Sequence, residues 1–151
     1  MKTLLFVCLA SLTAVADTPK GDPILTIDHD AVSGAKKPTT VTKLYADGSW
    51  TLAETTAEGK AGRTASGKLD KDDIARIKTA LDAAPWKVTH PTAHCMAMAQ
   101  TFTVFTAGKN TFTEKLCGTE LLDDKTLAAL DDADKALTTA AAAADPPCCK
   151  K

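Results

Sequence analysis

Two cysteines, Cys95 and Cys117, frame the stretch that most restricts how this chain can fold. Between them lie two runs rich in threonine and phenylalanine, residues 100–105 and 111–116, joined by a short loop that contains Gly108. β-Branched and aromatic residues favour strands, and a short glycine-containing loop between two such runs is typical of a β-hairpin. The stretch therefore predicts an antiparallel strand pair with a cysteine just outside each strand.

The register of this hairpin leads to two further predictions. Counting outward from the loop places Phe105 opposite Phe112, which would form an aromatic cross-strand pair. Paired strands bring their flanks together, so a disulfide between Cys95 and Cys117 would join the base of the hairpin. Such a bond is typical of small exported domains.

Residues 1–16 have the form of a secretory signal peptide. A basic start at Lys2 is followed by an apolar run, residues 3–12, and a small-residue site of the A-x-A type precedes Asp17. The apolar run is too short to span a bilayer as a helix. We therefore expect the mature chain to begin at Asp17 and to be secreted or periplasmic.

The composition bounds the remaining possibilities. Hydrophobic residues make up 44% of the chain and aromatic residues only 5%, which suits one modest aliphatic core. The net charge is −1 and no basic face stands out, so nucleic-acid binding has no electrostatic support. No second apolar stretch is long enough for a membrane span, and we expect a soluble monomer.

Three further strands are predicted in the first half of the domain, at residues 24–27, 40–46 and 49–56. Asp47 and Gly48 between the last two are typical of a two-residue type I′ turn, which would place Tyr45 opposite Trp50. Residues 56–68 are rich in threonine, glycine, lysine and alanine, and are predicted as a mobile loop or an edge.

Two helices are predicted from their caps and their apolar spacing. Asp70 is a suitable N-cap for the first, which Pro85 ends, and Asp123 is a suitable N-cap for the second. Helical spacing of apolar residues then gives each helix one apolar face: Ile74, Ile77, Leu81 and Ala84 in the first, and Leu127, Leu130, Ala133 and Leu137 in the second.

These elements follow the order β-β-β-α-β-β-α, and the short hairpins make the sheet mostly antiparallel. We therefore predict an α+β fold with a sheet of about five strands and both helices on one face. The predicted organisation is a signal peptide at 1–16, a flexible lead-in at 17–23, one α+β domain at 24–138, and an Ala-rich extension with a Cys-Cys-Lys-Lys tail at 139–151.

Few residues have the pattern that catalysis requires. The chain has three histidines and no nucleophile elbow or phosphate-binding glycine loop. Pairs of acidic residues fall at helix starts or on exposed helix faces, where capping and solubility explain them. We therefore expect a protein that is not an enzyme and needs no cofactor.

A soft-metal site is the alternative hypothesis. Imidazole, thiolate and thioether ligands together suit copper or zinc. The candidate ligands are His90, His94, Cys95, Met96, Met98, Cys148 and Cys149. A Cys95–Cys117 disulfide would remove one of these ligands.

A resemblance suggests a more specific function. The run at residues 41–52, the sequence Gly-Lys-Leu-Asp at 67–70 and the two hairpin cysteines lie in an order that resembles a group of small exported bacterial proteins. These proteins are related to emfourin, a protein inhibitor of thermolysin-type metallopeptidases. The resemblance covers residues 24–137. It implies the same fold and a protein partner, an extracellular metallopeptidase.

In that family the first strand runs into a Gly-Gly-hydrophobic-x-Gly loop. The corresponding residues here are 30–34, of which only Val32 and Gly34 keep the pattern. The resemblance therefore supports the fold more strongly than it supports inhibition of a peptidase. We predict that the partner-binding loop consists of Asp28, His29, Asp30, Val32 and Gly34. Val32 is the large apolar side chain that would enter a partner pocket. The alternative is an ordinary connecting loop with Val32 packed into the core.

Overall fold

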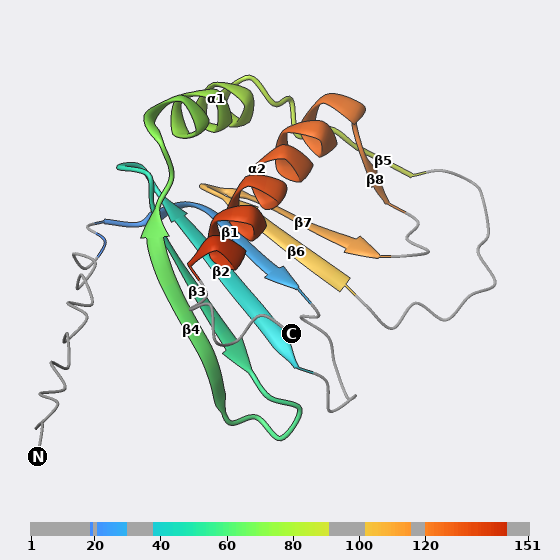
Figure 1. Ribbon diagram of the computed structural model, residues 1–151. Helices are drawn as coiled ribbons and strands as arrows, with labels where there is room; N and C mark the ends of the chain where they lie inside the picture. The colour runs from blue at the N-terminus through green and yellow to red at the C-terminus, as the bar shows by residue number, and fades with distance from the viewer. Residues whose placement is uncertain (1–18, 20, 30–37, 91–101, 116–119, 145–151) are drawn as a thin grey trace, which may run out of the picture.

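The computed structural model describes residues 19, 21–29, 38–90, 102–115 and 120–144. Six antiparallel strands form one sheet in the order β4-β3-β2-β1-β6-β7 (Figure 1). Their bounds are β1 Pro23–His29, β2 Thr39–Tyr45, β3 Ser49–Thr55, β4 Ala61–Lys68, β6 Phe102–Ala107 and β7 Asn110–Lys115. A separate two-stranded ribbon pairs β5 Val88–Thr89 with β8 Leu121–Leu122.

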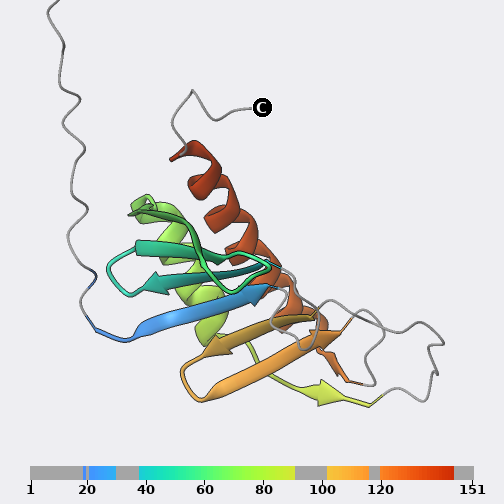
Figure 2. The same cartoon turned by 90° about the horizontal axis from the view of Figure 1, so that it is seen from below.

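Both helices, α1 Lys71–Asp82 and α2 Asp124–Ala143, pack over the same face of this sheet (Figures 1 and 2). The α+β class, the mostly antiparallel sheet and the order of elements are therefore confirmed.

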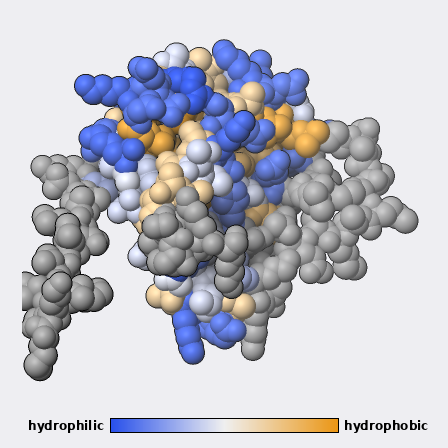
Figure 3. All heavy atoms as spheres, in the orientation of Figure 1, coloured by the Kyte–Doolittle hydropathy of each residue, from blue (hydrophilic) through white to orange (hydrophobic). Residues whose placement is uncertain are grey.

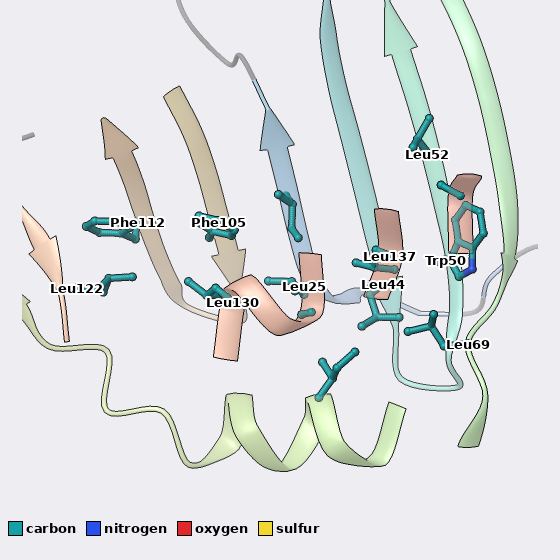
Figure 4. Close-up of a cluster of buried hydrophobic side chains, with 14 residues drawn as sticks. Leu25, Leu44, Trp50, Leu52, Leu69, Phe105, Phe112, Leu122, Leu130 and Leu137 are labelled. Carbon is teal, nitrogen blue, oxygen red and sulfur yellow. The ribbon is translucent and has the colours of Figure 1, made fainter. Parts of the chain in front are cut away.

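The core lies between the sheet and the helices. Strand side chains alternate between the two faces, and the apolar ones on the helix-covered face meet the apolar stripe of α2 (Figure 4). The largest fully buried side chains are those of Trp50, Leu25, Ile27, Leu44, Ile77, Leu130, Leu137 and Thr126. Because the core lies on one side of each helix, each helix needs only one apolar face.

The predicted hairpin register is confirmed for β6 and β7. Phe105 pairs with Phe112, and both side chains are buried. Ala107 pairs with Asn110, which leaves a two-residue turn in which Gly108 has a φ of 59°. Glycine adopts this left-handed conformation without a steric cost.

The turn between β2 and β3 differs from the prediction. Leu44, and not Tyr45, pairs with Trp50, so residues 46–48 form a three-residue loop. Only Gly48 in this loop has a positive φ, 84°, whereas a type I′ turn needs two such residues. The extra loop residue places Trp50 on the helix-covered face and Tyr45 on the other face.

Strand β4 is an edge strand, so residues 61–68 form the predicted edge and not a loop. Its sequence has a low β propensity, because most of its residues are glycine, alanine or serine. Gly67 pairs with Trp50, and a Cβ atom at residue 67 would lie 2.8 Å from the indole Cζ2 atom. The indole therefore occupies the space that a larger residue would fill.

Helix α1 begins as predicted. The Asp70 side chain accepts hydrogen bonds from the backbone N–H groups of Asp72 and Asp73, at 3.0 and 2.8 Å. These bonds satisfy two of the donors that a helix start leaves unpaired. Leu69 is buried before the cap and Ile74 packs against the same core, an arrangement known as a hydrophobic staple.

Helix α2 is longer than the predicted packed segment. It continues through Ala143 with Ala141 buried, so the start of the predicted Ala-rich extension, residues 139–143, belongs to this helix. The Arg63 Nη2 atom of β4 donates a hydrogen bond to the Ala141 carbonyl at 2.9 Å. Alanine side chains are small, so the C-terminal part of α2 can pack closely against the sheet.

The connection after α1 is held in an unusual conformation. Trp86 has a φ of 51°, in the left-handed region that bulky residues rarely adopt. Its backbone N–H donates to the buried Thr126 hydroxyl at 3.0 Å, and the N–H of Lys87 donates to the Asp123 carboxylate at 2.9 Å. The start of α2 thus fixes the conformation of Trp86.

Candidate functional site

Strand β1 ends with the two described residues of the predicted partner-binding loop, Asp28 and His29. Side chains alternate along a strand, so His29 lies on the helix-covered face with Ile27, and Asp28 lies on the opposite face. Strand β1 pairs with β2 and β6 on its two sides, so this end of β1 is central in the sheet.

His29 contacts two other elements. Its Nε2 atom lies 3.1 Å from the Asp134 Oδ1 atom of α2, and its Nδ1 atom lies 3.4 Å from the Thr103 hydroxyl of β6. The side chains of His29 and Asp134 are 35% and 29% exposed, which makes this a partly exposed ion pair when the imidazole is protonated. These contacts connect the end of β1 to the helix layer and to the neighbouring strand.

A hydroxyl, an imidazole and a carboxylate in sequence are also the residue types of a catalytic triad. The 3.4 Å separation between Thr103 and His29 is longer than a nucleophile–base hydrogen bond of about 2.6–3.2 Å. The arrangement therefore serves better to hold the end of β1 than to activate Thr103.

Asp28 lies in an apolar setting on the other face of the sheet. Its register partners are Val41 on β2 and Val104 on β6. The Oδ1 atom is buried and has no hydrogen-bond partner among the described residues. Burial raises the pKa of the Asp28 carboxyl above its ordinary value, and the charge of His29 offsets part of this rise.

The raised pKa predicts a pH-dependent effect of Asp28→Asn. The folded state binds the Asp28 proton more tightly than the unfolded state, so wild type loses stability as pH rises above the ordinary value of 3.8. The stability of Asp28→Asn relative to wild type should therefore increase between acidic and neutral pH in urea melts. Asp131→Asn, at an exposed position on α2, is the matched control. A relative stability that falls with rising pH would contradict this assignment.

The other residues of the predicted loop, Asp30, Val32 and Gly34, lie outside the described residues. Cys95 and Cys117 also lie outside them, so the disulfide remains a prediction.

Of the soft-metal candidates only His90 is described. Its side chain is 70% exposed, and its Nδ1 atom lies 4.0 Å from Glu120. Within the described part of the chain, no group of three or more His, Cys, Asp or Glu residues could hold a metal ion.

The contacts of His29 with Thr103 and Asp134 were not predicted from the sequence. Residues 29 and 134 are 105 positions apart, and no local pattern relates an aspartate of a helix to a distant strand end. The sequence signal that could have indicated these contacts is the alternation of side chains along β1, which places His29 on the face that the helices cover.

Comparisons with protein-family models, with curated proteins and with solved structures gave no match to this chain. Neither described helix is both long and apolar enough to cross a membrane. The function of the protein is therefore inferred from its own residues.

Proposed function

We propose that the mature chain is an exported, non-catalytic protein-binding domain that recognises its partner with residues 28–34. The observation that carries this proposal is the fixed position of His29 at the base of that loop. Asp134 of α2 and Thr103 of β6 both contact the His29 imidazole. Recognition loops commonly extend from such rigid supports, because a fixed base reduces the entropy lost on binding.

The resemblance to emfourin-type proteins suggests the class of partner, a thermolysin-type metallopeptidase outside the cytoplasm. Inhibition by this chain would need a side chain that enters the peptidase, and Val32 is the large apolar residue of the loop. Residues 30–34 depart from the family pattern, so inhibition of the peptidase has to be measured directly.

The experiment is a titration of a thermolysin-type peptidase with the mature domain and with Val32→Asp. We expect stoichiometric inhibition at micromolar domain, the affinity that a small interface supplies, and its loss in Val32→Asp without loss of the fold. No inhibition by the wild-type domain would contradict the peptidase as partner.

Val88→Asp is the matched control. Val88 and Leu121 are the large hydrophobic residues exposed on the described surface, at 43% and 52%. They lie in the β5–β8 ribbon, where Figure 3 shows orange atoms. Val88→Asp should inhibit like wild type. If it abolished inhibition while Val32→Asp did not, the interface would lie on the ribbon and not on the loop.

A further inference from the structure

A pocket of about 550 Å³ lies at the other end of β1, away from His29. It is open to solvent and is lined by the second half of α1, residues 84 and 86, the start of β1 and the turn between β6 and β7. The register of β1 with β6 brings the start of β1 to this turn, as Figures 1 and 2 show. Pockets of this size suit small ligands.

The walls of the pocket are mainly apolar. Ile24, Leu81, Trp86 and Ala107 line it, and all four pack against the edge of the core. Trp86 is the residue that the start of α2 holds at a φ of 51°. Rare backbone conformations of bulky residues cost free energy, and they occur most often where the side chain has a functional position to keep.

The charges of the pocket favour a cation. Asp22 and Asp82 supply two carboxylates, and Lys78 supplies one ammonium group. Asp82 lies in the last turn of α1, which contains no basic residue. The carbonyl end of a helix dipole is negative, so an acidic residue there is electrostatically unfavourable until a positive charge joins it.

We propose that this pocket binds a small organic cation, an ammonium or quaternary ammonium group carried on an apolar body. The apolar body would lie against Ile24 and Leu81, and the Trp86 indole would supply the aromatic surface that cations prefer. The positive charge would offset both Asp82 and the carbonyl end of α1. This site is separate from residues 28–34 and does not depend on the proposed protein partner.

The test is a titration of the isotope-labelled mature chain with benzyltrimethylammonium, followed by the backbone amide shifts. We expect a dissociation constant in the millimolar range, as for other ligands of this size, with shifts at residues 22–24, 78–86 and 107–110. Phenylacetate, which has a similar ring and the opposite charge, should not bind. Equal binding of phenylacetate, shifts elsewhere, or no shifts at tens of millimolar would overturn the proposal.

Two substitutions should change the affinity in opposite directions. Asp82→Asn should weaken binding about fivefold and Lys78→Gln should strengthen it about fivefold, as expected for one charge near a partly exposed cation. Asp82→Asn should at the same time raise the melting temperature, because it removes an acid from the end of α1. Asp131→Asn is the control and should leave the affinity unchanged. Changes of the same sign in Asp82→Asn and Lys78→Gln would show that charge does not select the ligand.

Discussion

Replacing Leu130 with alanine is expected to lower the free energy of unfolding by about 2–5 kcal/mol, the range for leucines truncated in a packed core. Leu130 is fully buried and points from α2 toward the sheet, in the layer that contains Leu25 and Phe105 (Figure 4). The truncation removes apolar contacts and leaves a cavity that two rigid layers cannot close. Urea melts of the purified protein would measure the loss.

Leu121→Ala is the matched control for this substitution. Leu121 is 52% exposed on the β5–β8 ribbon, so the same atoms are removed mostly from solvent. We expect a change below about 1 kcal/mol, because only part of the side chain leaves an apolar environment. Equal losses in the two variants would mean that α2 does not present Leu130 to the core.

Gly67→Val is expected to destabilise the domain by about 1–3 kcal/mol through overpacking. A Cβ atom at residue 67 would meet the Trp50 indole at 2.8 Å, and Trp50 is only 2% exposed. The indole cannot move without disturbing the core. β propensity alone predicts the opposite sign, since valine is favoured over glycine in strands.

Ser66→Val is the control for this second substitution. Ser66 is the neighbour of Gly67 on β4 and its side chain is exposed on the other face of the sheet. Valine at this position should be neutral or slightly stabilising. If Gly67→Val also stabilised the domain, β propensity and not contact with Trp50 would determine how substitutions in β4 change the stability.

Local patterns were sufficient to predict most of the fold. The Asp70 and Asp123 caps act within three residues of their own position, and the Phe105–Phe112 register follows from a turn of two residues. The apolar spacing of both helices likewise depends only on the helical repeat. Such features are encoded over a few residues, so the α+β class and the order of elements could be predicted without knowledge of distant contacts.

The predictions that differ from the structure concern segments with weak local preferences. For residues 61–68 the sequence left a loop and an edge open, because strand β4 is held by pairing with β3 and by the packing of Trp50 on Gly67, and its own sequence indicates neither contact. The C-terminal part of α2 packs because Ala141 can approach the sheet closely. The loop before Trp50 contains one residue more than its Asp-Gly sequence suggests.

The sequence by itself therefore determined the helix caps and apolar faces, the register of the β6–β7 hairpin and the α+β class, because each depends on neighbouring residues. Only the tertiary structure decided which distant groups meet. It placed His29 beside Asp134 across 105 positions, and it brought Trp86, Asp82 and Asp22 around one pocket. Contacts between distant residues depend on strand register and on the packing of helices against the sheet, and no local preference specifies them.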